Sequence, residues 1–165
     1  MNISYLLIGG NEGDRTANLQ RACDHISDSG CRILQASSVY ETAAWGKTDE
    51  KPFLNQALQV GTGLDAWPLM QVLLEIEQKM GRVRLERYGA RLIDIDILFF
   101  NDAIMNQPQL IIPHPEVPNR RFALVPMEEI AADYIHPVLH RSIAELLAIC
   151  PDPLEVRKLK KSKLN

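Results

Sequence analysis

Asp94 and Asp96 lie two residues apart at the front of an apolar run that continues to Phe100. Side chains alternate between the two faces of a strand, so both carboxylates project from one side while the isoleucines between them enter the core. Two like charges side by side are tolerable when a cation sits between them. Hard oxygen ligands favour magnesium or calcium over zinc. The pair predicts a divalent-metal site, with two solvated edge-strand carboxylates as the alternative.

Cationic residues surround this pair in the sequence. Four arginines precede it between residues 81 and 91, and few acidic residues nearby can neutralise them. Arginines beside a carboxylate metal site favour a polyphosphate ligand, although a surface salt-bridge network is the competing interpretation. Further along, His114 is held between two prolines, which suits a contact to a phosphate or leaving group. A lone loop histidine is otherwise usually structural.

Composition limits the class of protein. The chain has 165 residues, 46% of them hydrophobic and 24% charged, with a formal net charge of −3. This predicts one domain over 1–165 with a basic tail at about 155–165, and argues against nucleic-acid binding. The three cysteines lack metal-ligand spacing, which is typical of reduced thiols. With no signal peptide or membrane-spanning run, we expect a cytoplasmic protein that does not bind membranes.

The elements that position the aspartates follow from periodicity. Residues 3–8, 33–40 and 54–62 are predicted strands. Helical spacing predicts one helix that Asp14 begins and Gly30 ends, and another between Asp65 and Gly81. With the Asp-Ile-Asp strand, the order is β-α-β-β-α-β, an α+β ferredoxin-like sandwich with helices on one face of the sheet and long active-site loops.

The remaining third has a different character. Eight of the ten prolines lie beyond residue 100, so long regular elements are not expected before a capping box at Ser142 and Glu145. We expect this C-terminal extension to pack on the same core. The glycines after the first strand lack the rest of a phosphate-binding loop, and a turn that needs positive φ is the better interpretation. The predicted core is Ile3, Tyr5, Leu7, Leu19, Ile26, Leu54, Leu58, Leu73, Ile76, Ile93, Ile95 and Ile97, and its burial within one fold predicts a monomer.

Together these segments resemble a known family. The stretch Arg87-Tyr88-Gly89-Ala90-Arg91-Leu92-Ile93-Asp94-Ile95-Asp96-Ile97 is similar to the signature of 6-hydroxymethyl-7,8-dihydropterin pyrophosphokinase. The other similar blocks occur in the family's order: Ile8-Gly9-Gly10-Asn11, Ser37-Ser38-Val39-Tyr40-Glu41-Thr42, Phe53-Leu54-Asn55-Gln56-Ala57, Gly81-Arg82-Val83-Arg84, Pro113-His114-Pro115 and Asn119-Arg120-Arg121-Phe122. Because the chain ends soon after these blocks, we expect a monofunctional version without a fused folate-pathway partner.

The resemblance implies transfer of pyrophosphate from ATP to the hydroxymethyl group of the reduced pterin, with release of AMP, in tetrahydrofolate biosynthesis. Two magnesium ions held by Asp94 and Asp96 would be the cofactors, and Arg82 and Arg91 would stabilise the transferred group. The implied ATP-binding residues are Glu77, Arg82, Arg84, Arg91, His114 and Arg120. The implied pterin-binding residues are Thr42, Ala43, Ala44, Trp45, Phe53, Asn55 and Phe122, with Asn55 at the ring's polar edge and Phe122 stacked on its face.

Some positions depart from the family pattern. Phe53 and Tyr88 replace a common tyrosine and a frequent tryptophan, and Ala43 and Ala90 replace prolines, which should loosen both loops. Gln109 and Pro118 stand where a cation often meets the nucleotide. These changes concern affinity and loop closure; they leave the metal ligands and Asn55 intact.

Two other functions remain open from the residues alone. One is a magnesium-dependent phosphohydrolase or nucleotidyl transferase, which would not require a pterin. The other is a regulatory domain that binds a nucleotide without turnover. Neither needs a pterin-shaped pocket, so Asn55 together with Phe122 discriminates best among the three.

Overall fold

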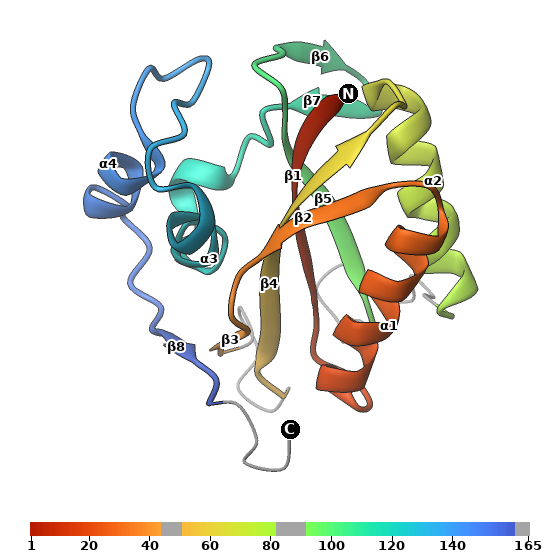
Figure 1. The fold of residues 1–165 in the computed structure, drawn as a ribbon. Helices are drawn as coiled ribbons and strands as arrows, with labels where there is room; N and C mark the ends of the chain where they lie inside the picture. Colours follow the sequence, from red (N-terminus) through yellow and green to blue (C-terminus); the bar gives the residue numbers. More distant parts are fainter. Residues whose placement is uncertain (44–50, 82–91, 161–165) are drawn as a thin grey trace.

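Strands from both ends of the chain form the central sheet of this computed structural model, which describes residues 1–43, 51–81 and 92–160. Within those ranges the sheet has six strands, all paired antiparallel, in the order β5-β1-β4-β3-β8, with β2 also paired to β4 (Figure 1). The strands are β1 (Asn2–Gly10), β2 (Arg32–Ala36), β3 (Tyr40–Thr42), β4 (Phe53–Thr62), β5 (Asp94–Phe100) and β8 (Val156–Lys158).

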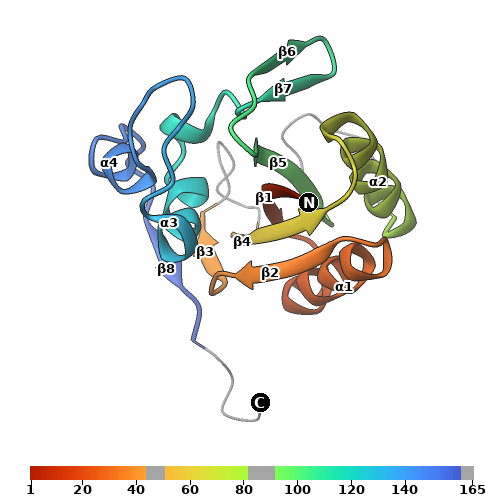
Figure 2. The same cartoon turned by 45° about the horizontal axis from the view of Figure 1, so that its top comes forward.

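Helices cover both faces of this sheet. The helices α1 (Arg15–Asp28) and α2 (Ala66–Lys79) lie on one face, while α3 (Arg121–Ala131) and α4 (Ile143–Ala148) lie on the other (Figures 1 and 2). The α+β ferredoxin-like arrangement is confirmed. The expectation of helices on one face holds for α1 and α2 only, because the C-terminal extension supplies a second helical layer.

The prediction that the extension packs on one shared core is only partly right. Leu110 and Ile112 join the core of α1 and α2, whereas the helices of the extension form a second core on the other face of the sheet. Side chains of α1 and α2 pack with alternate residues of the strands, such as Leu6 and Ile8. The other face carries Tyr5 and Leu7, which pack with α3 and α4. All predicted core residues except Ile3 are buried, but they divide between these two clusters because strand side chains alternate.

Helix ends follow the local sequence closely. Asp14 caps α1 by accepting a hydrogen bond from Ala17 N at 3.1 Å. Gly30 and Gly81, just beyond α1 and α2, adopt positive φ values of 89° and 85°, which glycine tolerates without strain. Asp65 precedes α2 as predicted, although its side chain makes no capping hydrogen bond. The capping box of α4 is confirmed in both directions, since Ser142 and Glu145 each accept from the other's backbone at 3.1 Å.

The predicted strand over residues 33–40 is wrong in one respect, because it is interrupted. β2 ends at Ala36, and β3 begins at Tyr40. In the gap, Ser37 Oγ accepts from Ala57 N at 2.9 Å, and the carboxylate of Glu129 on α3 accepts from Ser38 N at 3.0 Å. These two side-chain contacts, with one backbone hydrogen bond from Ser37 N to Ala57 O at 2.9 Å, take the place of regular strand pairing here.

The expectation of no long element before Ser142 is also wrong. α3 has 11 residues with Pro126 inside it, and its buried face packs on the sheet through Ala123, Leu124 and Met127. Packing of an amphipathic face therefore outweighs the loss of one backbone donor at the proline. The chain reaches α3 through a hairpin of β6 (Met105–Gln107) and β7 (Leu110–Ile112), a cis Ile112–Pro113 bond and a short 3-10 turn, η1 (Val117–Asn119).

The three cysteines are free thiols, as predicted. Among the described residues, no helix combines the length and apolar character needed to cross a bilayer.

Candidate active site

Three strands bring Asn55 and Asp94 onto one row of the sheet. Gly9 of β1 is paired with Asn55 of β4 on one side and with Asp94 of β5 on the other. Directly paired residues project from the same face, so the amide and the carboxylate lie on a common surface, about 10 Å apart by two strand spacings. This row lies at the lower end of the sheet in Figure 1, where β1 ends and where β4 and β5 begin.

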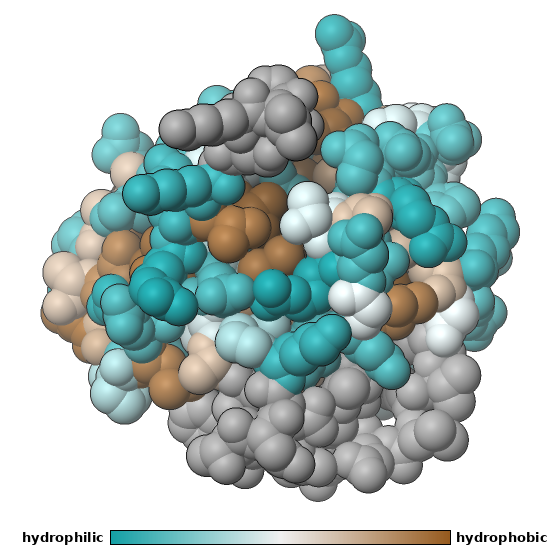
Figure 3. All heavy atoms as spheres, turned by 90° about the horizontal axis from the view of Figure 1, so that it is seen from below, coloured by the Kyte–Doolittle hydropathy of each residue, from teal (hydrophilic) through white to brown (hydrophobic). Residues whose placement is uncertain are grey.

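The aspartates share one face of β5, as the alternation in the sequence predicts, and this is the face of the sheet on which α3 lies. Ile93, Ile95 and Ile97 are buried against the α1 and α2 side, while Asp94 is half-buried and Asp96 is exposed. The sheet surface beyond them on that face is apolar. The site therefore has carboxylates at its rim and hydrocarbon behind them, and Figure 3 shows this end of the molecule with an apolar area enclosed by hydrophilic side chains.

Magnesium is a suitable ion for such a pair. The described residues contain no group of three or more potential metal-ligating side chains, so they offer no all-protein cage. Magnesium is typically bound by one or two carboxylates, with substrate phosphates and water completing an octahedron. Asp94 and Asp96, on one face of β5, fit this kind of site.

His114 lies close to this pair although it is far along the chain. Its backbone N donates to Leu98 O at 2.9 Å, which ties the residue to β5. Burial lowers the pKa of His114; the Asp96 carboxylate opposes this shift, and the Arg120 guanidinium adds to it. His114 Nδ1 accepts from Glu116 N at 3.2 Å. In the neutral imidazole the proton is thus on Nε2, which makes that nitrogen a donor suited to a phosphate oxygen.

Arg120 and Phe122 lie at the start of α3. The guanidinium carbon of Arg120 is 5.5 Å from the centre of the Phe122 ring, a cation–π distance. Arg120 Nε also lies 3.8 Å from Glu116 Oε2, and both side chains of this pair are 46% exposed. Phe122 is half-buried against the α3 side of the sheet. A stacking surface and a cation therefore stand next to each other near His114.

Glu77 supports the aspartates from the opposite face. This residue of α2 is buried, and its Oε2 accepts a hydrogen bond from Ile95 N at 2.6 Å. Ile95 is the residue between Asp94 and Asp96, so the contact holds the backbone that carries both. The contact places the Glu77 carboxylate against β5 on the α2 face of the sheet. ATP binding by Glu77 stays a prediction.

The candidate pterin residues of β3 and β4 lie together. Thr42 is paired with Phe53, and Asn55 is two residues further along the same face of β4. Thr42 Oγ1 is buried and has no hydrogen-bond partner among the described residues. Ala43 is exposed at the end of β3. Ala44, Trp45, Arg82, Arg84 and Arg91, also predicted for the site, lie outside the described residues.

One residue of this site was not predicted. Gly9 remains within β1, which extends to Gly10, and of the glycines in that segment only Gly13 has the expected positive φ, 68°. A Cβ at position 9 would overlap Asn55 Oδ1 and lie 2.8 Å from Leu54 O. A glycine at the end of a strand pattern is a signal of such close approach.

Comparison with known proteins agrees with this geometry. The family model for 7,8-dihydro-6-hydroxymethylpterin-pyrophosphokinase (HPPK) matches residues 5–132. A 2-amino-4-hydroxy-6-hydroxymethyldihydropteridine pyrophosphokinase of Methylorubrum extorquens is 42% identical over 136 residues, covering 82% of this chain and 86% of the relative. The Bacillus subtilis protein of the same name is 38% identical over 130 residues, or 78% of each chain.

Solved structures share the fold. An HPPK-DHPS crystal structure from Plasmodium falciparum superposes with a TM-score of 0.71 at 18% sequence identity, over 89% of this chain. This chain spans 45% of that larger protein, whose name joins two activities. From the match over residues 5–132 and from the curated relatives, the chain belongs to the 7,8-dihydro-6-hydroxymethylpterin-pyrophosphokinase family.

Proposed function

We propose that this protein transfers the pyrophosphoryl group of ATP to the hydroxymethyl group of 6-hydroxymethyl-7,8-dihydropterin, releasing AMP, as a step of tetrahydrofolate biosynthesis. ATP is the co-substrate, and the reaction depends on magnesium. In this transfer the pterin hydroxyl oxygen forms a bond to the β-phosphorus of ATP. The bond from that phosphorus to the oxygen it shares with the α-phosphate breaks, and the hydroxyl proton is released.

The arrangement of Asn55, Gly9 and Asp94 is the observation that carries this proposal. It puts a hydrogen-bonding amide two strands away from a carboxylate that can bind metal, and Gly9 places no side chain on the strand between them. A flat, polar heterocycle held by its edge at Asn55 would extend across β1 toward Asp94. Neither a simple phosphohydrolase nor a regulatory nucleotide-binding domain requires that arrangement.

In this mechanism Asp94 and Asp96 would hold two magnesium ions. When bound, magnesium would supply positive charge that neutralises the phosphate oxygens. The two carboxylates thereby determine on which side of the pterin subsite the phosphates bind. The position of the two carboxylates depends on β5, which is paired with β1 on one edge and is supported by a hydrogen bond between Ile95 N and Glu77 of α2.

The other described residues bind and orient the two substrates. Neutral His114 offers Nε2–H to a phosphate oxygen, and Arg120 contributes a positive charge beside it. Phe122 stacks on one face of the pterin ring and contributes apolar contact area. Asn55 forms hydrogen bonds with the polar edge of the ring and so distinguishes the pterin from other flat molecules. Arg82 and Arg91 are proposed to stabilise the transferred group. Arg84 is a proposed ATP contact.

A product assay tests the proposal directly. The protein is incubated with ATP, magnesium and 6-hydroxymethyl-7,8-dihydropterin, and AMP and the pterin diphosphate are quantified with and without the pterin. We expect equal amounts of the two products and AMP only when the pterin is present. AMP or ADP formed equally well without pterin would instead identify a hydrolase. Nucleotide binding without any turnover would identify a regulatory module.

We further propose that residues 1–165 act as one monomeric domain in the cytoplasm. Support for the single domain comes from the pairing of β8 with β3, which joins the C-terminal segment to the central sheet. Sedimentation equilibrium should yield a mass near 18.6 kDa. A concentration-independent dimer mass would contradict the monomer.

A further inference from the structure

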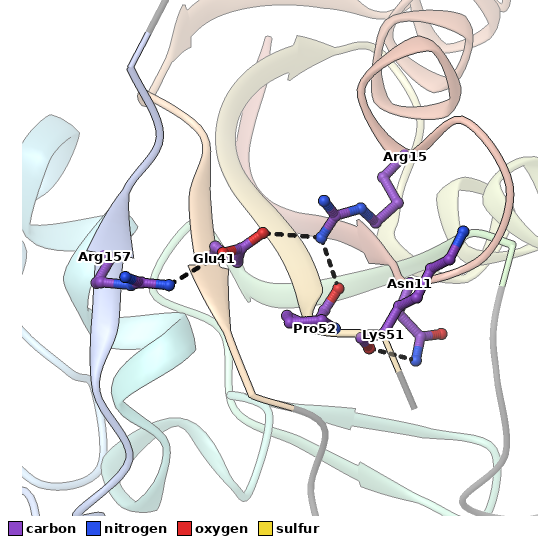
Figure 4. A network of polar contacts seen from close by, with 6 residues as sticks. All are labelled: Asn11, Arg15, Glu41, Lys51, Pro52 and Arg157. Atoms are coloured by element: carbon purple, nitrogen blue, oxygen red, sulfur yellow. Dashed lines mark hydrogen bonds and ion pairs between the residues drawn. The ribbon is translucent and has the colours of Figure 1, made fainter. Parts of the chain in front are cut away.

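Glu41 of β3 is held between two arginines from distant parts of the chain. Its Oε2 lies 2.9 Å from Arg15 Nη1, at the start of α1, and its Oε1 lies 3.3 Å from Arg157 Nη2, on β8 (Figure 4). The Glu41 side chain is only 19% exposed, and that of Arg15 26%, whereas that of Arg157 is 68% exposed. The Arg15–Glu41 contact is therefore the better shielded of the two.

Arg15 also contacts the backbone that leads into β4. The same Nη1 donates to Pro52 O at 2.8 Å. Beside it, Asn11 Nδ2 donates to Lys51 O at 3.0 Å (Figure 4). Asn11, just after β1, and Arg15, at the start of α1, thus bind two successive carbonyls just before β4. Arg15 also binds the Glu41 side chain of β3.

The backbone that presents Arg15 is itself well fixed. Arg15 is the first residue of α1, directly after the Asp14 cap. Asn18 of α1 holds the preceding turn, because its Nδ2 donates to Glu12 O at 3.0 Å, and Gly13 in that turn adopts a positive φ of 68°. Since these contacts are local to the start of α1, Arg15 can act as a support for β3 and β4 instead of depending on them for its position.

The contacts of Arg15 lie directly beside candidate pterin residues. Glu41 precedes Thr42 and Pro52 precedes Phe53, and Thr42 is paired with Phe53 across the two strands. We propose that Arg15 is a positioning residue for the pterin half of the site: through Glu41 and Pro52 it fixes the separation of β3 and β4 where Thr42 and Phe53 face each other. This rests on the proposed function.

Arg157 extends the support to the C-terminal strand. Glu41 is directly paired with Arg157 between β3 and β8, and Leu159 N donates to Val39 O at 2.8 Å. Because Arg157 is mostly exposed, its ion pair contributes less than the Arg15 contact. We therefore expect Arg15 to contribute more than Arg157 to the position of Glu41, and the C-terminal strand to contribute through the Arg157 ion pair.

Variants of Arg15 separate positioning from general stability. Arg15→Met removes both hydrogen bonds, whereas Arg15→Lys keeps a cation whose single nitrogen can reach both acceptors. Arg141→Met is the matched control, since Arg141, just before α4, forms an exposed pair with Glu145 of that helix at 4.0 Å. For each variant we would measure the Kd for 6-hydroxymethylpterin by fluorescence, KM for the pterin and for ATP, kcat, and the thermal unfolding midpoint.

We expect Arg15→Met to raise the pterin Kd and KM roughly tenfold, the equivalent of one charge-assisted contact, with little change in the KM for ATP. Arg15→Lys should recover most of the affinity, Glu41→Gln should resemble Arg15→Met, and Arg157→Met should have a smaller effect. Arg141→Met should match the wild type.

An unchanged pterin Kd in Arg15→Met would overturn the positioning role. Equal losses for pterin and ATP that follow the thermal midpoint would overturn it too, because they indicate a structural role alone. The wild-type protein serves to distinguish the two proposals. If the wild-type protein forms no pterin-dependent AMP, the proposed function fails. If the wild type is active and the Arg15 variants bind pterin as tightly as it does, the positioning proposal fails while the proposed function stands.

Discussion

Gly9 lies directly opposite Asn55 in the pairing of β1 with β4, and the space a side chain would take at position 9 is already filled by the Asn55 amide. A Cβ there would overlap Asn55 Oδ1 and approach Leu54 O to 2.8 Å. The Asn55 amide therefore packs directly against the backbone of β1 at Gly9. On its other side, Gly9 faces Asp94.

Substituting Gly9 tests that contact. Gly9→Ala should displace the Asn55 amide, because overpacking in a close-packed site costs roughly 1–3 kcal/mol and forces neighbouring side chains to shift. We expect pterin affinity to fall by about tenfold or more, at roughly 1.4 kcal/mol per decade. Gly63→Ala is the matched control, since nothing lies within 4 Å of a Cβ at that position. Pterin titrations of both variants measure the difference; equal affinities would contradict the role of Gly9.

The metal requirement should reside in Asp94 and Asp96. Asp94→Asn and Asp96→Asn each remove a negative charge from the predicted magnesium site, and we expect kcat to fall by at least about 10². Chelation with EDTA should abolish the wild-type activity, and added magnesium should restore it. Asp102→Asn, at an exposed position just after β5, is the control. Wild-type turnover in either site variant, or activity that survives chelation, would refute the assignment.

Glu77 should matter for stability as well as for rate. Glu77→Leu leaves Ile95 N without its 2.6 Å acceptor, and an unsatisfied buried donor costs about 1–3 kcal/mol of unfolding free energy. Because β5 carries both aspartates, kcat should fall too. Glu77→Gln keeps an oxygen that can accept the bond and should lose less of both.

Urea unfolding and steady-state kinetics measure the two effects of the Glu77 variants. Glu75→Leu, on the exposed side of the same helix, is the control. If Glu77→Leu were as stable and as active as this control, the supporting role of Glu77 would be disproved.

Stability should fall in mild acid partly because of His136. Burial lowers its pKa below the usual 6.5, and the neighbouring His140 adds to the shift. Nδ1 of the His136 ring accepts from Val138 N at 3.2 Å and from Leu139 N at 3.1 Å, which suits the neutral form. Below pH 6.5 the unfolded chain thus binds more protons than the folded one, so the unfolding free energy decreases as the pH drops from 6.5 through the folded pKa.

His136→Asn keeps an acceptor for these backbone donors but cannot become charged. We expect its unfolding free energy to depend less on pH than that of the wild type between about pH 7 and about pH 5. Some dependence should remain, because burial lowers the pKa of His114 as well. His25→Asn, in the last turn of α1, is the matched control for replacing a histidine by asparagine. An identical pH profile in wild type and His136→Asn would contradict the prediction.

Local patterns in the sequence were sufficient for much of this fold. The alternation of Asp94 and Asp96 with isoleucines placed the carboxylates on one face of β5, and Ser142 with Glu145 identified the start of α4. Such features depend on neighbours a few residues away, through the pleat of a strand or the first turn of a helix. The family signature supplied the reaction, because its residues occur in order along the chain.

Contacts between distant segments decided the rest. α3 forms in spite of Pro126 because its apolar face packs on the sheet, and the strand after Ile33 breaks where Glu129 of that helix binds Ser38. Local sequence patterns cannot predict the packing of α3 or the Glu129–Ser38 hydrogen bond, because both contacts form only when the helix packs on the sheet.

The site follows the same division. Asn55 and Asp94 were recognised from the sequence, but the sequence by itself does not state which strand separates them. Only the antiparallel pairing of β4 and β5 with β1 places Gly9 between the two. Likewise, the link of Arg15 to Glu41 joins residues 26 positions apart, and it exists because α1 begins beside the end of β3. The sequence determines which residue types are available, whereas strand pairing and helix packing determine which of them become neighbours in the site.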